Sequence, residues 1–445
     1  MNSRTQASRW GWTCLLLGAL ALAACGVAPE PPEEEAREES VSAMQDDGGG
    51  PSPAPTWSEP SFASGSVVAS DGNQFLVVWR DVGRPGQLYA ARVSKHGRLL
   101  DPEALRLNPA PEVEAGDPAV AFDGGQFLVV WQGQFSLFLV RVERDGTVVD
   151  SPPLPIADIF GSPAPAPALA CAWRQCLVAW LDFADPGSVR GALLRTDDTG
   201  LGTQELTISS PAEAVSSFGI SAAWTNNHFL VVWSDARFGG FKLLASRVRS
   251  DGRVLDPDGI RVSDSPGDQT FMDVVGTKRG FLVAWSDSRN GPRDIFGTRV
   301  RLDGSVPDPD GFPLSIGPGD DIIPALAYDG QWVLATWSRL APDRGSTTIR
   351  GNLVRPHGTV ATPDGFLLSG GEFVREVDQD VVFGSGKYFM AYGGAPTVDE
   401  PPFQVILGTR LRRDGTRVDD PAIRISHSPS VEGTTVAPVE PVMRK

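Results

Sequence analysis

A unit of about 52 residues repeats along most of this chain, and this period limits the possible folds more than any other feature. The repeat is plainest from Phe229 to Ser263 and from Phe281 to Ser315, which begin FLVVWSD and FLVAWSD. One repeat domain is therefore a better interpretation of the 445 residues than several unrelated domains. The aromatic residue that ends each FLVVW-like segment marks seven units, at Trp79, Trp131, Trp180, Trp233, Trp285, Trp337 and Tyr392. A turn glycine gives the same count, at Gly97, Gly146, Gly200, Gly252, Gly304, Gly358 and Gly415.

Each unit has the pattern of four short strands joined by tight turns. In the second unit the strands are predicted at Pro118 to Phe122, Phe127 to Trp131, Leu137 to Val142 and a segment that ends near Ile156. The Asp145-Gly146 dipeptide before the fourth strand is typical of a two-residue hairpin turn. The 49 glycines and 38 prolines of the chain agree with many such turns.

Seven units of four strands predict an all-β fold, a seven-bladed β-propeller over residues 57–428. A lone four-stranded sheet with two apolar faces is unstable in water, whereas a ring of blades covers both faces. We therefore expect the aligned tryptophans to pack between blades. An open array of modules is the alternative, although it would expose apolar faces. The mode of ring closure is left open, because Trp57 to Phe62 or Val431 to Val442 could add an outer strand.

The first 25 residues are predicted to be a bacterial lipoprotein signal peptide. Arg4 and Arg9 precede an uncharged stretch of 15 residues, and Leu22-Ala23-Ala24-Cys25 matches a lipobox. Cys25 would then carry fatty acyl chains such as palmitate and anchor an exported protein in a membrane. Gly26 is not the Asp that favours inner-membrane retention, so we expect the outer membrane, on its periplasmic or its cell-surface face. An ordinary secretory signal is the alternative, and no later segment is long enough to predict a transmembrane helix.

Composition separates a tether and a tail from the repeats. Residues 26–56 are rich in Pro, Glu and Gly and are predicted to form a disordered tether with a net charge of −7, and residues 429–445 a C-terminal tail. The leader carries +2, so −11 of the total of −16 remains for residues 57–445, without a long charge run. Nucleic acids and anionic lipid surfaces both require a basic patch. We therefore expect neither as a partner.

Cys171 and Cys176 are the only cysteines beyond the leader and the lipobox. They occupy two repeat positions that hold aromatic pairs elsewhere, such as Phe122 and Phe127. An exported protein should join them in a structural disulfide. A redox or metal site is the alternative, but the C-x4-C spacing is not the thioredoxin type and no His lies nearby in the sequence.

The charged residues of the repeats are interpreted as structural. Three units carry an Asp after the aligned Trp and an Arg on the predicted third strand, and we expect pairs within each unit: Asp81 with Arg92, Asp235 with Arg247 and Asp287 with Arg299. The Asp-Pro-Asp-Gly segments at 256–259 and 308–311 favour turns over calcium, because they lack the dense spacing of oxygen ligands that calcium needs. No loop gathers an acid, a base and a nucleophile, so no catalytic residue, cofactor or metal ligand is predicted.

The repeats resemble those of secreted bacterial β-propeller-like proteins built from LVVWxDxR, GxRV and DGxVxDPxG motifs. Units four and five match nearly throughout, as in Trp233, Asp235 and Arg237 and in Trp285, Asp287 and Arg289. The resemblance spans residues 57 to about 428 and implies a propeller. Proteins of this kind are generally without an assigned activity, so the resemblance adds little about function.

These observations favour a lipid-anchored, non-catalytic binding or assembly scaffold at the cell envelope. We expect a monomer with an unknown protein or polysaccharide ligand. Leu340 to Thr348 and Gly394 to Pro402 depart most from the repeat and are the expected contact loops. One alternative is a carbohydrate-active enzyme with carboxylates on one face of the propeller. Another is a purely structural envelope protein.

Overall fold

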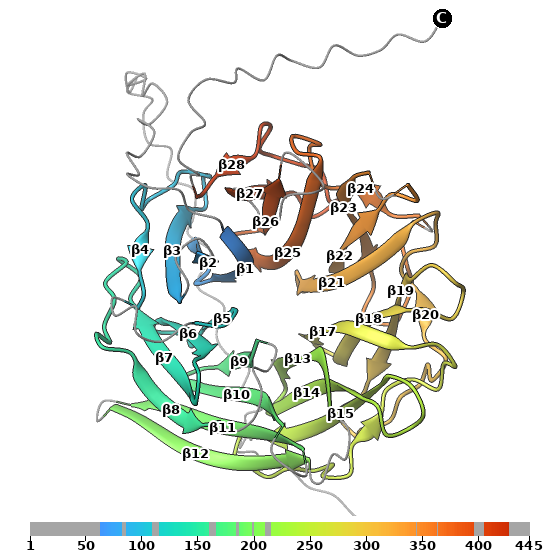
Figure 1. Ribbon diagram of the computed structural model, residues 1–445, viewed down its shortest axis with the longest axis horizontal. Coiled ribbons are helices and arrows are strands. Elements are labelled where there is room, and N and C mark those ends of the chain that lie inside the picture. Colours follow the sequence, from blue (N-terminus) through green and yellow to red (C-terminus); the bar gives the residue numbers. More distant parts are fainter. Residues whose placement is uncertain are drawn as a thin grey trace, which may run out of the picture. The chain divides into compact units, whose positions relative to one another are not determined.

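The computed structural model describes residues 63–81, 86–108, 115–159, 166–183, 187–197, 200–209, 215–343, 345–362, 364–395 and 405–426. These ranges contain 28 β-strands, four in each repeat. Within them, no helix is long and apolar enough to cross a membrane. The chain is an all-β protein with the four-stranded blades of a β-propeller, and its first strands lie around the centre of Figure 1.

The strands recur at matching positions in the seven repeats. The first strands are β1 (Ala63–Ser70), β5 (Pro118–Phe122), β9 (Ala168–Ala172), β13 (Val215–Thr225), β17 (Gln269–Thr277), β21 (Asp320–Tyr328) and β25 (Arg375–Gly384). The second strands are β2 (Gln74–Asp81), β6 (Phe127–Gln132), β10 (Gln175–Asp182), β14 (His228–Asp235), β18 (Gly280–Asp287), β22 (Val333–Leu340) and β26 (Lys387–Ala395). The third strands are β3 (Gln87–Ser94), β7 (Ser136–Val142), β11 (Ser188–Asp197), β15 (Lys242–Arg249), β19 (Asp294–Val300), β23 (Thr347–Val354) and β27 (Val405–Leu411). The fourth strands are β4 (Leu105–Arg106), β8 (Leu154–Asp158), β12 (Gly200–Ser209), β16 (Ile260–Arg261), β20 (Phe312–Pro313), β24 (Phe366–Leu367) and β28 (Ile423–Arg424).

The sheets differ in one respect from the predicted seven separate blades. The first five repeats each form a separate antiparallel sheet of four strands in chain order. Repeats six and seven share one sheet of eight strands, because Thr347 of β23 pairs in parallel with Arg375 of β25. The Thr347 amide donates to the Val374 carbonyl at 3.0 Å. This backbone contact between neighbouring repeats leaves no trace in the repeat pattern of the sequence.

The second strands are buried because they lie in the middle of each sheet and a neighbouring sheet covers each face. β18 is buried at every position. Trp233 of β14 is completely buried and packs in one cluster with Leu177 and Leu193 of the preceding sheet. The prediction that the aligned tryptophans pack between sheets is confirmed. Such a cluster takes apolar residues from two repeats, so neither repeat has a complete core by itself.

An arginine on the third strand joins neighbouring repeats near their outer turns. Arg247 of β15 binds the carboxylate of Asp256 through Nε and Nη2, each at 2.8 Å. Its Nη1 donates to the carbonyl of Leu302 in the next repeat at 2.6 Å. A β-carbon at Gly304 would lie 2.9 Å from this guanidinium, so the turn residue has to be glycine for this close approach. Arg92 makes the same contacts, with Asp101 and with the next repeat.

The predicted pairing of the motif Asp with this arginine is therefore wrong. Asp235 instead binds Arg237, two residues away, through Oδ2 and Nη2 at 2.7 Å. Asp287 binds Arg289 in the same way at 2.6 Å. The side chains of the WxDxR motif lie at the end of the second strand, whereas the third-strand arginine points to the Asp nine residues further along the chain. Each of these repeats therefore contains two ion pairs, one within the WxDxR motif and one made by the third-strand arginine, in place of the single pair that was expected.

The seventh repeat closes the ring by packing directly against the first. β25 lies beside β1. The amide of Val68 donates to Oδ2 of Asp380 at 2.8 Å, and the Ser66 hydroxyl donates to the Asp378 carbonyl at 3.2 Å. On the outer side, Arg410 Nη1 donates to the carbonyl of Lys95 at 3.1 Å. The two segments considered for an outer clasp, 57–62 and 431–442, lie outside the described residues.

Candidate functional site

A cavity of 640 Å³ lies at the centre of the ring, bounded by the first strand of every repeat. The lining combines small apolar residues with four carboxylates and one guanidinium. It comprises residues 65–68, 117–120, 166–169, 220–222, 272–274, 323–326 and 378–380, together with Arg80. Because all seven repeats contribute, the cavity is built by the ring and not by any single repeat.

The first strands bulge where they line this cavity. The register between β25 and β26 shifts between Val377 and Asp380, and Asp378 has a φ of 52°. Ile323 and Phe271 occupy the same repeat position, with φ of 55° and 48°. Left-handed backbone at residues with a β-carbon costs on the order of 1–3 kcal/mol each. The ring packing therefore holds the cavity wall in a conformation that an isolated strand would avoid.

Two of the cavity carboxylates connect neighbouring repeats. Asp273 and Asp380 each lie twelve residues before the aligned aromatic residue. Asp273 Oδ2 accepts the amide of Leu326 in the next repeat at 2.8 Å, and Asp380 Oδ2 accepts that of Val68. Burial raises the pKa of Asp273, and it raises that of Asp380 to about 7. These carboxylates bind backbone amides and also border the cavity.

Asp378 and Asp117 complete the polar part of the wall, and of the four carboxylates Asp117 is the exposed one. Asp117 is paired with Arg80, with 3.1 Å between Oδ1 and Nε. Burial, and then the negative charge of Asp117, raise the pKa of Asp378 to about 6, against the opposing effect of Arg375. The cavity therefore contains a carboxylate that gains a proton in mildly acidic solution beside one that is held in an ion pair. Together with Arg80, these groups can accept and donate hydrogen bonds to a polar ligand.

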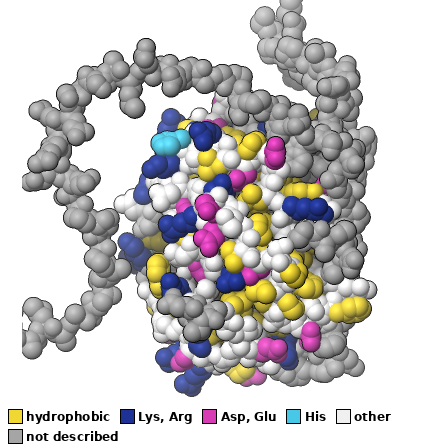
Figure 2. Space-filling view, turned by 90° about the vertical axis from the view of Figure 1, so that its left-hand side faces the viewer, with side chains coloured by type: hydrophobic (Ala, Val, Ile, Leu, Met, Phe, Trp, Pro, Cys, Tyr) yellow, Lys and Arg dark blue, Asp and Glu magenta, His cyan; other side chains and the backbone are white. Residues whose placement is uncertain are grey.

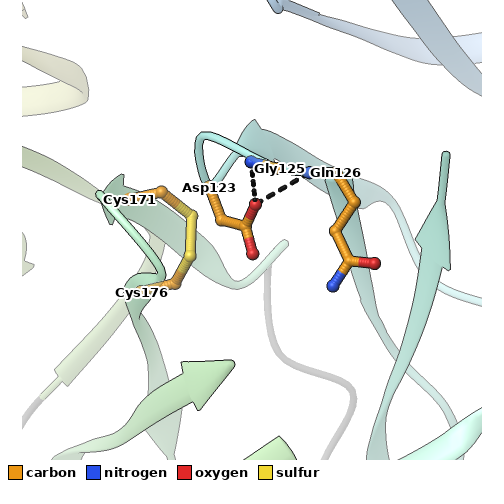
Figure 3. The surroundings of a disulfide bond; sticks show 5 residues. All are labelled: Asp123, Gly125, Gln126, Cys171 and Cys176. Carbon is orange, nitrogen blue, oxygen red and sulfur yellow. Dashed lines mark hydrogen bonds between the residues drawn. A yellow bond between two sulfur atoms is a disulfide. The ribbon is translucent and has the colours of Figure 1, made fainter. Parts of the chain in front are cut away.

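The predicted disulfide between Cys171 and Cys176 is confirmed. The two residues lie opposite each other on β9 and β10 and bridge the first hairpin of the third repeat (Figure 3). Asp123, in the turn of the preceding repeat, lies nearby and accepts the amides of Gly125 and Gln126, each at 2.8 Å. The bridge thus replaces the aromatic contact made at this position by Phe122 and Phe127 in the second repeat. The other predicted site residue, Cys25, lies outside the described residues.

One end of the sheets gathers basic side chains, which the sequence analysis did not predict. The tight turns between first and second strands, and the tight turns that directly follow the third strands, lie at this end, here called the turn face. Figure 2 shows Lys and Arg side chains along the left-hand side of the described part. The sequence has no long run of basic residues, so these side chains are brought to one end by the fold. The basic residues in these turns are Lys95, Arg98, Arg144, Arg174, Arg253, Lys278, Arg279, Arg301, Arg355, Arg412 and Arg413.

The acidic residues of the turn face fall into two groups. Three are buried and bind amides of their own turns: Asp71, Asp123 and Asp329. Five are exposed: Glu143, Asp145, Asp251, Asp303 and Asp414. The described turns of this face therefore hold eleven basic and eight acidic side chains, a small positive excess, whereas residues 57–445 as a whole carry a net charge of −11.

The remaining sequence candidates lie apart from the cavity lining. Asp256 and Asp308, considered for calcium, each bind an arginine, Arg247 and Arg299. Among the described residues, no group of three or more His, Cys, Asp or Glu side chains is arranged to hold a metal ion. The loop at 340–348 is the turn between β22 and β23, where the amide of Ala341 donates to the Ser346 carbonyl at 3.0 Å. Of the loop at 394–402, residues 396–402 lie outside the described residues.

Sequence reasoning missed the cavity carboxylates, although the repeat contains a signal for them. The position twelve residues before the aligned aromatic residue holds Val67, Ala119 and Ala168 in the first three repeats, but Asp273 and Asp380 in the fifth and seventh. A charged residue at one position of a buried strand identifies a polar contact in the ring. The position of this strand at the centre is a property of the assembled ring, so the pattern alone did not place the carboxylates in a cavity.

The fold and the cavity define a β-propeller with a polar central cavity. No protein-family model matches the chain. No curated protein matches it either. Among solved structures, the chain is similar to a prolyl endopeptidase, with a TM-score of 0.50, 10% identity, and coverage of 83% of this chain and 50% of that one.

Two further structures are similar at lower scores. A puromycin-hydrolyzing peptidase of Mycobacterium tuberculosis has a TM-score of 0.47 and 13% identity, with coverage of 83% of this chain and 54% of that chain. The β-propeller domain of the Trilobed protease from Pyrococcus furiosus has a TM-score of 0.48 and 11% identity, with coverage of 84% and 100%. The chain thus spans about half the length of both peptidases that it matches. At these identities the likeness concerns the fold alone.

Proposed function

We propose that this chain is an exported, lipid-anchored β-propeller that acts as a non-catalytic binding scaffold at the cell envelope, with its ligand in the central cavity. The observation that carries the proposal is the cavity itself. Its 640 Å³ lies within the usual range of ligand sites, roughly 300–1,000 Å³. Its lining combines apolar surface with a few polar groups, which is the composition that orients a bound molecule.

The ring of this scaffold has seven blades. In this interpretation the eight-stranded sheet is two blades, β21–β24 and β25–β28, that touch through the single parallel bridge at Thr347. Two observations support the count. The aligned aromatic residues mark seven repeats, and each repeat contributes its own first strand to the cavity wall.

The ligand is a polysaccharide or a segment of another protein, of which one part enters the cavity. Hydroxyl groups of a sugar, or amides of a peptide, can donate to Asp117 and Asp378 and accept from Arg80. Small apolar residues such as Ala119 and Ala168 leave room for the ligand between the charged groups. A long polymer would lie across the opening, with one unit or one chain end inside.

The test uses the non-acylated mature chain, beginning at Gly26, as bait against envelope extract and a panel of surface polysaccharides. Two variants are compared with it: Asp117→Asn with Asp378→Asn in the cavity, and a chain whose 340–348 loop is replaced by a short turn. We expect a ligand that binds saturably. The loop variant should bind it as tightly as the parent chain, and the affinity of the cavity variant should be at least tenfold lower. Loss in the loop variant alone would move the site to that loop. If no form retains a ligand, the purely structural role gains support.

Membrane anchoring is tested separately through Cys25. Replacement by Ala should leave the leader uncleaved or release the protein from the membrane fraction, because the acylated residue is gone. Intact mass and membrane fractionation measure this. Unchanged mass and unchanged fractionation in the variant would overturn the anchor and leave the cavity proposal untouched.

A carbohydrate-active enzyme is the second candidate, and Asp378 is the observation that favours it. A carboxylic acid with a raised pKa beside an ionised carboxylate is the arrangement that glycosidases use. Any polysaccharide retained by the bait should therefore be incubated with the chain and examined for new reducing ends. Hydrolysis that disappears in Asp378→Asn, while binding persists, would establish the enzyme.

A further inference from the structure

The disulfide-bridged hairpin of the third repeat carries an exposed tryptophan on the turn face. Trp173 lies in the turn between β9 and β10, inside the loop closed by Cys171 and Cys176, and 74% of its surface is exposed. The aligned tryptophans are buried, in contrast. A covalent bridge at the base of a short turn limits the conformations of its tip. The indole is therefore held in solvent by a rigid support.

Three arginines lie on the segments next to this indole. Trp173 lies against the neighbouring turn, where a β-carbon at Gly124 would be only 2.4 Å from the ring. Arg144 Nη2 donates to the Gly124 carbonyl at 3.3 Å, and the Arg174 amide donates to the Asp123 carbonyl at 2.7 Å. Arg195 of β11 lies opposite Gln175, two residues beyond Trp173. We call Arg144, Trp173, Arg174 and Arg195 the Trp173 cluster.

The arginines of the cluster are exposed to solvent. Arg144 is 49% exposed although its Nε lies 3.7 Å from Asp71. Arg195 is exposed and makes a long bond, 3.4 Å, to the Ser250 carbonyl. Arg174 is exposed. Each therefore presents charge to solvent beside an apolar ring.

Exposed basic residues also occur in the turns of other repeats on this face, together with the five exposed acidic residues named above. Because the turns lie at one end of the sheets, these side chains form a ring-shaped layer and not a single stripe. A layer of this kind fits a flat anionic surface better than it fits a nucleic-acid strand, which is recognised along a groove. Six of the seven repeats contribute an exposed Lys or Arg, at Lys95, Arg144, Arg174, Arg253, Lys278 and Arg412.

We propose that the turn face docks on an anionic phospholipid bilayer, with Trp173 in the interfacial layer and the surrounding arginines on lipid phosphates. Tryptophan favours the membrane–water interface, because its ring is apolar and its N–H is polar. Arginine binds phosphate through paired N–H donors. Basic residues near an anionic leaflet contribute about 1 kcal/mol each, so several such contacts can hold the face on a membrane.

This docking would orient a protein that its lipid anchor only tethers. Residues 26–62 separate Cys25 from β1, so the anchor alone leaves the direction of the ring free. With the turn face on the bilayer, the opposite end of the ring would point away from the membrane. The proposal builds on the proposed export of the chain, but its test does not use the acyl group.

The test measures sedimentation of the non-acylated chain from Gly26 with vesicles of phosphatidylglycerol and phosphatidylcholine, and with vesicles of phosphatidylcholine alone. The variant is Trp173→Ala with Arg174→Gln and Arg195→Gln. The matched control changes exposed residues outside the turn face: Phe135→Ala with Arg106→Gln and Arg424→Gln. Thermal unfolding of each variant confirms that the fold is retained. A second measurement follows fluorescence quenching by brominated lipid in the parent chain and in Trp173→Phe.

We expect binding to the anionic vesicles only, weakening as salt rises. The partition coefficient of the Trp173 variant should fall by at least tenfold, while the control stays within twofold. Brominated lipid should quench the parent chain more than Trp173→Phe. The proposal is overturned if anionic vesicles bind no better than neutral ones, or if the two triple variants bind equally. Tighter binding to a single-stranded oligonucleotide than to vesicles would assign the face to nucleic acid instead.

Discussion

The side chain of Arg410 donates a hydrogen bond to the backbone carbonyl of Lys95, 315 residues earlier in the chain, at 3.1 Å. The Asp419 carboxylate holds the same guanidinium through Nε and Nη2. Arg92 and Arg247 make equivalent contacts between consecutive repeats. The ends of the repeat array are therefore joined by the same contact that joins its interior.

Replacement of Arg410 should weaken the closing contact specifically. Arg410→Gln removes the ion pair with Asp419 and the bond to Lys95, at an expected cost of about 2 kcal/mol in the free energy of unfolding. Arg92→Gln is the matched control, since it removes the same contacts between consecutive repeats. Native-state hydrogen exchange should show faster exchange of β1 and β25 amides in Arg410→Gln than in the control. Equal exchange in both variants would show that the contact does not hold the ring closed.

Replacing a glycine in a turn between the third and fourth strands should cost more free energy of unfolding than its positive φ alone predicts. Gly97 and Gly72 have nearly equal φ, 86° and 88°. A β-carbon would lie 2.8 Å from the Arg410 guanidinium at Gly97, but in open space at Gly72. Gly72→Ala should cost about 1 kcal/mol in the free energy of unfolding from strain, and Gly97→Ala roughly 1 kcal/mol more, because the arginine must move. Urea unfolding measures both, and equal costs would contradict the role of the arginine.

Loss of the disulfide should destabilise the chain modestly. Cys171→Ala with Cys176→Ala opens a loop of only a few residues, so the expected cost is about 2 kcal/mol in the free energy of unfolding. Thermal unfolding with and without reductant is the measurement, and reductant should affect the parent chain but not the variant. Alkylation followed by intact mass should find no free thiol at either residue. Two alkylated cysteines in the non-reduced chain from Gly26 would disprove the bridge.

The stability of the chain should depend on pH through Asp378. Its pKa is about 6 in the folded chain against 3.8 in the unfolded one, so the folded state holds a proton that the unfolded state has lost between these values. The carboxyl therefore reduces stability as pH rises from about 4 to 6, and that loss persists above 6. Asn cannot ionise and tolerates a positive φ well. Asp378→Asn should match the parent near pH 4 and exceed it near pH 8, on the order of 2 kcal/mol.

Unfolding of the parent and of Asp378→Asn across pH 4 to 8 gives the measurement. The difference between the two proteins isolates this carboxyl, because every other titrating group is common to both. Asp378→Glu is the control, since it keeps the charge. A constant difference over the whole range would show that Asp378 titrates normally in the folded chain.

The features that recur with the repeat could be predicted from the sequence alone. The predicted strands of the second repeat match β5, β6 and β7 within a residue, because buried strands with tight turns have a strong local pattern. The bridge between Cys171 and Cys176 followed from their positions in the repeat. The burial of Trp233 between sheets followed from its place in a fully apolar strand.

Contacts made across the ring were not predictable in the same way. Arg247 could pair with either of two aspartates in its repeat, and only the geometry of the outer turn selects Asp256 over Asp235. The cavity carboxylates and the turn face require knowledge of which residues from different repeats meet. A net charge also contains no information on where each sign lies, so the acidic composition did not predict the basic side chains of the turn face.

Each repeat contains its own four strands, and Arg410 joins the last repeat to the first as Arg247 joins two consecutive repeats. The starting point of the chain is therefore arbitrary with respect to these contacts. A circular permutant that begins in the turn near residue 344 and links the present ends should assemble the same ring. The position of a repeat in the gene and its position in the ring are then independent.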